Sequence, residues 1–281
     1  MEIADAATYF DNTEVYDAYT SALSFTGQLD LYDGWARDTV TGGRRSISVA
    51  PSVSVPARRA VSIEGHYYLI GESVKDSFQG AALRIHYVLQ RVSGLATIKT
   101  AVQALSSGGT QAYANRGWKK DLKAELVTSD LYNTVNMYFS TYETVSRGHL
   151  LSLDSRLHRV HNVSPAEGGF TIAECSELEA DAVQTVSYTA VAAGGYTAAT
   201  DTYAYSAPAS LSVLYEPAFS HYHLRTPAAD KVLAGDMIVT VAKSSLTPRV
   251  GETFTLKSLS YRVLEVLDDS FSSWEMWSRR V

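Results

Sequence analysis

The sequence predicts an all-β, mainly antiparallel protein with two barrel- or sandwich-like units joined by a short helical connection. Three observations predict this class. Short segments alternate apolar and polar residues with a period of two, as a half-buried strand requires. Paired glycines at 42–43, 108–109, 168–169 and 194–195 mark turns between segments. One strand–turn–strand pattern also occurs more than once along the chain.

The alternation is clearest in residues 82–92, ALRIHYVLQRV. One face of this predicted strand carries Leu83, Ile85, Tyr87 and Leu89, and the opposite face carries Arg84, His86 and Gln90. A similar alternation of apolar and polar residues runs from Arg45 onwards, whereas residues 1–30 fit either a short helix or a first strand. We therefore assign residues 1–92 to an N-terminal β-barrel-like unit.

Residues 93–125 interrupt this alternation and are predicted to connect the two β units. The segment GLATIKTAVQAL (94–105) predicts a short helix, SSGGTQ (106–111) a turn, and RGWKKDLKAEL (116–126) a second helical stretch. A connection of this length is expected to have structure of its own. The alternation then returns, and residues 126–281 form the predicted C-terminal β unit.

Residues 188–210 stand apart within the C-terminal unit because they are poor in charge and rich in Ala, Thr, Tyr and Gly. They predict a long mobile loop or hairpin. It is either a surface insertion or an arm that becomes ordered against a neighbouring subunit. The tyrosines of this candidate mobile arm are Tyr188, Tyr196, Tyr203 and Tyr205.

The repeated pattern appears when residues 148–163 are placed over residues 251–266 without gaps. Identical residues then coincide at Gly148/Gly251, Leu153/Leu256, Ser155/Ser258, Arg159/Arg262, Val160/Val263 and Val163/Val266. Residues 61–78 over 254–271 match at Tyr68/Tyr261, Glu72/Glu265 and the Asp-Ser-Phe run that ends both segments. The shared unit is a strand, a short turn, a second strand, another turn and a third strand. It predicts related small barrels or sandwiches within one chain.

Composition favours a structural protein over an enzyme or a nucleic-acid-binding protein. Hydrophobic residues make up 46% of the 281 residues and charged residues only 19%, which suggests a surface covered by identical neighbours. The net charge of −6 disfavours binding to phosphates, which requires clustered basic residues. A negative wall instead suits a conduit through which DNA passes without sticking.

The sequence shows no motif for catalysis or for a cofactor. Phosphate-binding loops, dinucleotide fingerprints and nucleophile elbows are absent. The single cysteine, Cys175, has acidic neighbours that disfavour its thiolate. The pairs His221/His223 and His158/His161 are possible metal half-sites, but exposed histidines explain them more simply. We expect no enzyme activity, no catalytic residues, no metal and no cofactor.

Two groups of residues are candidates for subunit contacts. The first is the densest basic patch, with Arg116, Trp118, Lys119 and Lys120. It could pack on an acidic neighbour, contact phosphate or be solvated, and we favour the interface. The second is the C-terminal set of Trp274, Trp277, Arg279 and Arg280. These large side chains suit either a core or an interface hot spot.

The C-terminal segment VGETFTLKSLSYRVLEVLDDSFSSWEMWSRRV resembles the end of head-completion or stopper proteins, the small β-barrel connectors between head and tail of tailed bacteriophages. The shared form is Gly-x-x-hydrophobic, a turn, Tyr-x-Val, a turn and a last strand ending in Arg. Residues 68–92 resemble the same ending of a first barrel. The chain is larger than typical members of that family, which leaves its layer in the connector (adaptor, stopper or collar) open.

The resemblance implies a ring of six or twelve copies at the head-to-tail junction of the virion. Its partners would be the portal or adaptor protein and the tail proteins, with genomic DNA in the channel. No signal peptide or membrane span is evident, so we expect synthesis in the host cytoplasm. The alternatives are a tail terminator or tail-tube ring protein and, from another class, a carbohydrate-binding β-sandwich module.

Overall fold

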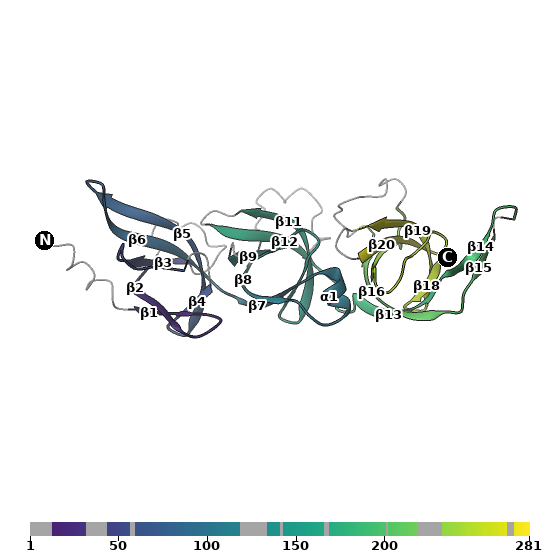
Figure 1. Ribbon diagram of the computed structural model, residues 1–281, viewed down its shortest axis with the longest axis horizontal. Coiled ribbons are helices and arrows are strands. Elements are labelled where there is room, and N and C mark those ends of the chain that lie inside the picture. The colour runs from purple at the N-terminus through teal and green to yellow at the C-terminus, as the bar shows by residue number, and fades with distance from the viewer. Residues whose placement is uncertain are drawn as a thin grey trace. The chain divides into compact units, whose positions relative to one another are not determined.

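The computed structural model describes residues 13–31, 44–56, 60–118, 134–140, 143–165, 169–200, 202–218, 232–268 and 273–281. It confirms an all-β, antiparallel protein built from barrels, with one short helix among these residues (Figure 1). Within the described residues, there is no helix long and apolar enough to cross a membrane.

The first barrel occupies much of the predicted N-terminal unit. Its strands are β1 (Thr13–Asp17), β2 (Leu23–Leu31), β3 (Arg44–Val49), β4 (Ala60–Ile63), β5 (His66–Phe78) and β6 (Ala81–Arg91). They close in the order β1-β2-β3-β6-β5-β4. The first strand pairs with the fourth through Val15 and Ile63, and this pairing completes the ring of strands. Ile85 and Leu89 of β6 face the core, as the alternation predicted, whereas Leu83 at the outer end of that strand is exposed.

The third barrel has the same order near the C-terminus. Its strands are β13 (Val183–Thr189), β16 (Ala209–Pro217), β17 (Met237–Ala242), β18 (Thr253–Leu256), β19 (Leu259–Asp268) and β20 (Ser273–Arg280), in the order β13-β16-β17-β20-β19-β18. Strand β13 pairs with β18 through Tyr188 and Phe254. A separate two-stranded sheet is formed by β14 (Val191–Thr197) and β15 (Thr202–Tyr205), which follow β13 and precede β16 in the sequence.

A middle barrel repeats this topology. Its strands are β7 (Gly94–Lys99), β8 (Thr110–Trp118), β9 (Thr134–Ser140), β10 (Leu150–Leu153), β11 (Arg156–Pro165) and β12 (Phe170–Glu177), in the order β10-β11-β12-β9-β8-β7. The chain divides into two compact units that share the strands of this barrel. One unit comprises residues 1–97, 111–147 and 162–176. The other comprises residues 98–110, 148–161 and 177–281.

The segment predicted to be a helical connection therefore differs from the prediction. Residues 94–99 form β7, with Ala96 and Ile98 buried at alternate positions, and only α1 (Ala101–Leu105) is helical. Thr100 begins this helix because its side chain accepts from the Gln103 N–H while the Gln103 side chain accepts from the Thr100 N–H. The predicted second helical stretch starts within β8, and residues 119–126 lie outside the described residues.

The sequence repeat corresponds to one hairpin that occurs in all three barrels, between the fourth and fifth strands: β4–β5, β10–β11 and β18–β19. Each turn has two residues with positive φ, Glu64-Gly65 at 50° and 77°, Asp154-Ser155 at 52° and 62°, and Lys257-Ser258 at 50° and 64°. Turns of this hand match the right-handed twist of the flanking strands. The short turn fixes the register, so equivalent residues of each hairpin face the same way.

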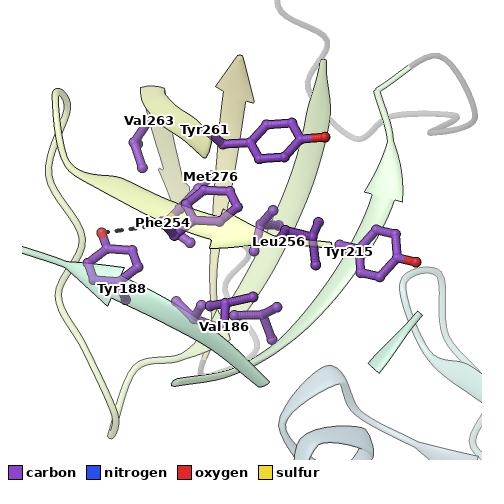
Figure 2. Close-up of a cluster of buried hydrophobic side chains, with 11 residues drawn as sticks. Val186, Tyr188, Tyr215, Phe254, Leu256, Tyr261, Val263 and Met276 are labelled. Carbon is purple, nitrogen blue, oxygen red and sulfur yellow. Dashed lines mark hydrogen bonds between the residues drawn. The ribbon is translucent and has the colours of Figure 1, made fainter. Parts of the chain in front are cut away.

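The core of the third barrel shows why the hairpin sequence repeats (Figure 2). Tyr188, Phe254 and Tyr261 pack as parallel rings inside the barrel, with centroids 6.3 Å and 5.4 Å apart. In the first barrel the aligned positions Tyr68 and Ile70 are buried in the core, as are Tyr261 and Val263 here. The repeated residues are therefore those that fill the interior, where each aromatic side chain removes a large apolar area from water.

The left-handed turns generate a stability prediction. We expect Ser258→Gly to stabilise the protein by about 0.5–1 kcal/mol, because glycine adopts φ of 64° without the steric cost that serine pays. The matched control Ser260→Gly, two residues later on an exposed face of β19, should destabilise by a similar amount. Urea unfolding followed by circular dichroism measures both. A shift of the same sign in the two variants would contradict the turn geometry.

Candidate assembly surface

The chain segment between the first and second strands of each barrel is the candidate functional feature, and we name it the first connection. It comprises residues 18–22 in the first barrel, 100–109 in the middle barrel and 190–208 in the third. It is a short turn in the first barrel, holds α1 in the middle one and holds the β14–β15 hairpin in the third. Insertions of different size thus occupy one topological position.

The first connection of the first barrel contacts the middle barrel. Tyr19 donates from its hydroxyl to Glu143 Oε1 at 2.8 Å, and Tyr113 on β8 donates to the Ala18 carbonyl at 2.8 Å. The Tyr19 and Tyr113 rings meet edge to face with centroids 4.9 Å apart, and Tyr67 stacks on Tyr113 at 5.0 Å. Burial and the bond to Glu143 raise the pKa of Tyr19, so it donates at neutral pH.

Apolar packing and backbone bonds extend this contact. Leu69 and Val88 of the first barrel pack with Phe170 of the middle barrel in one buried cluster. The Ser93 N–H donates to the Ala114 carbonyl at 2.8 Å. At Gly169 (φ +78°), an added Cβ would lie 3.0 Å from the Glu72 nitrogen, so this position requires glycine for both conformation and space.

The first connection of the middle barrel likewise contacts the barrel that follows it, the third barrel. Helix α1 packs against β16 and β17, and its Ala104 and Leu105 lie against the buried Leu214 of β16. Leu150 of β10 joins the same cluster. The contacts of Tyr19 include Tyr113 on β8, the second strand of the middle barrel, and those of α1 include both β16 and β17, the second and third strands of the third barrel.

A buried ion pair joins the middle and third barrels beside this cluster. Arg159 on β11 pairs with Glu216 on β16, and the side chains are only 6% and 3% exposed. Neither charge can be solvated there, so each depends on the other. The repeat aligns Arg159 with Arg262, which is exposed on β19. The same residue type therefore joins two barrels at one position and faces solvent at the other.

The first connection of the third barrel is anchored at its base. The buried carboxylate of Glu252 accepts from the Val191 N–H at 2.9 Å, from the Arg249 N–H at 2.7 Å and from the Tyr188 hydroxyl. Tyr205 donates to the Gly251 carbonyl at 3.0 Å. The hairpin beyond these anchors projects from the barrel (Figure 1).

The candidate mobile arm therefore needs correction at Tyr188. This residue is 3% exposed, and its ring belongs to the barrel core because β13 continues to Thr189 before the chain leaves the sheet. Tyr205 is 40% exposed and fixed at the hairpin base. Tyr196 and Tyr203 form a cross-strand pair in the hairpin backbone, and their side chains lie outside the described part of the structure.

Only part of the basic patch lies among the described residues. Arg116 and Trp118 lie on β8, and the Arg116 N–H donates to Ser93 Oγ at 2.9 Å. The Arg116 side chain is half-buried near the contact between the first and middle barrels. The Trp118 side chain, Lys119 and Lys120 lie outside what the structure describes.

At the C-terminus, Trp277 and Arg279 both contact Asp236 of the third barrel. The Trp277 indole donates to Asp236 Oδ2 at 3.0 Å, and Arg279 makes a two-point contact with the same carboxylate at 3.0 Å and 2.9 Å. Trp277 is 6% exposed. Trp274 is half-buried beneath Lys243, and Arg280 remains exposed.

Only one of the two candidate metal half-sites lies among the described residues. His221 and His223 lie outside the described residues, and His158 is fully buried in β11. The described residues contain no cluster of three or more His, Cys, Asp or Glu able to hold a metal. For Cys175, burial first and Glu174 second raise the pKa of the thiol to about 12. The main cause is therefore the apolar interior, which the sequence did not reveal.

One side-chain arrangement was missed by sequence reasoning. Ser48 Oγ lies 2.8 Å from His86 Nδ1, and His86 Nε2 lies 2.9 Å from Asp76 Oδ2. The three residues sit on adjacent strands, and Arg84 also bonds to Asp76. This resembles the order of groups in a nucleophilic triad, but Ser48 is 0% exposed and no substrate could reach it. The arrangement stabilises the outer face of the barrel, and only strand register brings it together.

Comparison with known proteins gives no match to a family model, a curated protein or a solved structure.

The buried ion pair generates a prediction. We expect Arg159→Met to destabilise the protein by about 3–5 kcal/mol, because it leaves the Glu216 carboxylate buried without its partner. The change should appear as a lower urea midpoint. The double variant Arg159→Met/Glu216→Leu should recover most of the loss. The matched control Arg262→Met changes an exposed residue at the repeat-equivalent position and should shift stability by less than about 0.5 kcal/mol. Equal losses for Arg159→Met and Arg262→Met would contradict the assignment.

Asp236 generates a prediction for pH dependence. Burial by itself would raise the pKa of this carboxyl, but Arg279, the Leu233 N–H and the Trp277 indole together lower it. A lowered folded pKa means that the stabilisation is present above the unfolded value of about 3.9 and is lost as the pH falls through the folded pKa.

We therefore expect Asp236→Asn to cost about 2 kcal/mol at pH 7 and to flatten the loss of stability below about pH 4. Thermal unfolding between pH 7 and pH 2 measures both effects. The control Asp154→Asn, in an exposed left-handed turn, should keep the wild-type acid profile. An unchanged acid profile for Asp236→Asn would exclude this role.

Proposed function

We propose that this chain is a structural protein of a tailed-bacteriophage virion, a ring-forming head-to-tail connector that links the portal and head to the tail. The observation that carries the proposal is the C-terminal pattern that resembles such connectors. It forms the meander β18–β19–β20, and β4–β5–β6 and β10–β11–β12 have the same arrangement. The unit that resembles a connector barrel thus occurs three times.

The contacts between barrels support a mechanical role. Buried side chains from neighbouring barrels join them, including the Arg159–Glu216 pair and the clusters around Phe170 and Leu214. Truncating such groups would cost several kcal/mol. Buried contacts of this kind suit a protein that transmits force between head and tail and that withstands the pressure of packaged DNA.

The net charge suits a DNA channel without sequence-specific binding. A net charge of −6 repels phosphates, so DNA would pass without the counterion release that drives tight association. In this role the protein retains or passes DNA by its ring geometry alone. The reaction chemistry of an enzyme plays no part in it.

The carbohydrate-binding alternative would use exposed tyrosines, and among the described residues Tyr19, Tyr67 and Tyr205 are exposed. Tyr68, Tyr188, Tyr215 and Tyr261 are buried, and the Tyr19, Tyr67 and Tyr113 rings contact one another. We favour the connector because the Tyr19 and Tyr67 rings are engaged by Tyr113 and do not form an open platform. A tail terminator or tail-tube ring would use the same ring geometry at another level of the virion.

The proposal predicts a ring of six or twelve copies with a central hole. The native mass of the purified protein and negative-stain images test this, first on the protein alone and then after it is mixed with purified tailless heads. Heads that bind the protein should retain their DNA, measured as resistance to nuclease. A protein that stays monomeric, leaves heads unbound and leaves their DNA exposed would overturn the proposal. Heads mixed with the destabilised Arg159→Met variant serve as the control.

A further inference from the structure

We propose that Tyr67 and Tyr113 form a site of oxidative cross-linking, at which a peroxide-dependent one-electron oxidant joins the two rings as a dityrosine. Tyr67 lies on β5 of the first barrel and Tyr113 on β8 of the middle barrel. The new bond would therefore tie these two barrels together covalently. The cross-link does not depend on the proposed function, because it is scored on the isolated chain.

The two rings are already arranged for carbon–carbon coupling. Tyr67 and Tyr113 stack with their centroids 5.0 Å apart and an interplanar angle of 20°. Two phenoxyl radicals couple when their ring faces approach each other, because the unpaired electron occupies an orbital perpendicular to the ring. Tyr19 also contacts Tyr113, but it meets that ring edge to face at 64°, a geometry in which the two orbitals do not overlap.

The hydroxyl groups of the stacked pair lie at the same end of the stack. Burial, and after it the neighbouring Tyr67 hydroxyl, raise the pKa of Tyr113. One hydroxyl affects the pKa of another in this way only when the two groups are close. The ring carbons beside each hydroxyl carry much of the unpaired electron density of a phenoxyl radical. The head-to-head arrangement therefore brings the reactive carbons of the two rings together.

Hydrogen bonds hold both rings in this arrangement before any oxidant arrives. Tyr113 donates from its hydroxyl to the Ala18 carbonyl at 2.8 Å, and its N–H donates to the Tyr19 hydroxyl at 3.3 Å. The Tyr67 carbonyl accepts from the Val92 N–H at 2.8 Å. Groups that are held in contact react as parts of one molecule, which favours coupling within the chain over coupling between chains.

Exposure distinguishes this pair from the stacked rings of the third barrel. Tyr67 is 44% exposed, so an oxidant reaches it from solvent. The stacks of Phe254 with Tyr188 and Tyr261 are buried, and each includes a phenylalanine, which forms no phenoxyl radical. The native thiol of Cys175 is buried as well, so it does not reach and reduce a radical at the surface.

The coupling balances with hydrogen peroxide as the terminal oxidant. Each phenol gives one electron to the peroxidase and its hydroxyl proton to water. The two radicals then form a bond between ring carbons ortho to the oxygens. The hydrogens on those two carbons move to the oxygens, which restores both aromatic rings. The two electrons and two protons released reduce one peroxide molecule to two water molecules.

Oxidation of the purified chain by a haem peroxidase with limiting hydrogen peroxide tests the site. Dityrosine fluorescence gives the rate, and peptide mass spectrometry identifies the linked residues by the loss of two hydrogens. We expect the Tyr67–Tyr113 link to form at least about tenfold faster than any other dityrosine. Tyr67→Phe should abolish this link while keeping the ring stack. The matched control Tyr205→Phe removes a phenol that is 40% exposed and should leave the link unchanged.

A stability measurement shows whether the link ties the barrels in their folded arrangement. The bond closes the loop from residue 67 to residue 113 and so restricts the unfolded chain, as a disulfide does. Oxidised wild-type protein should therefore unfold at a higher urea concentration than untreated protein. Oxidised Tyr67→Phe should keep the urea midpoint of its untreated form, because it lacks the phenol that forms the link.

Links spread evenly over the exposed tyrosines, or a dominant Tyr19–Tyr113 link, would overturn the proposed cross-linking site. Dityrosine that forms mainly between chains in dilute protein would also overturn it, because the stacked pair would then not be held for coupling. A urea midpoint that falls on oxidation of the wild type would do the same. A Tyr67–Tyr113 link that forms first and raises the midpoint supports the site, whether or not the protein forms rings or binds heads.

Discussion

Closure of each six-stranded sheet is the constraint on which the rest of this structure depends. The first strand pairs with the fourth, as in β1–β4 and β13–β18, so these barrels have no open edge. An open edge would offer unpaired N–H and C=O groups to any neighbouring strand. A closed barrel can join another only through side chains and through the connections between strands. This is why Tyr19, α1 and the β14–β15 hairpin, all in first connections, become the parts available for contacts.

The interior of each barrel is constrained by packing, and its exterior by what the barrel contacts. The interior must be filled to the density of an organic crystal, and the positions that fill it recur, as Tyr68 and Tyr261 do. The exterior is adapted to what each barrel touches. Arg159 pairs with Glu216 in a dry joint, whereas the aligned Arg262 faces solvent. One topology thus serves three positions in the chain because the interior is retained while the outer face varies.

A single polar group fixes the base of the hairpin, and another fixes the end of the last strand. Glu252 holds Val191, Arg249 and Tyr188 with one buried carboxylate. Asp236 does the same for Trp277 and Arg279. Buried carboxylates are costly unless several donors meet them, so both residues give their surroundings one well-defined arrangement. Trp277 and Arg279, two of the four C-terminal candidates, make these contacts inside the chain.

The sequence by itself determined the β class, the hairpin repeat and the alternation of β6, because period-two patterns and two-residue turns are local properties. It did not reveal the middle barrel, since GLATIKTAVQAL spaces Leu95, Ile98 and Val102 in a way that suits a helix as well as a strand. Only the tertiary structure decided which side chains meet across long separations. Asp236 reaches Trp277, Arg159 reaches Glu216, and Ser48 reaches His86 through barrel closure and strand register. No local pattern encodes those pairings, because each depends on how whole strands align in space.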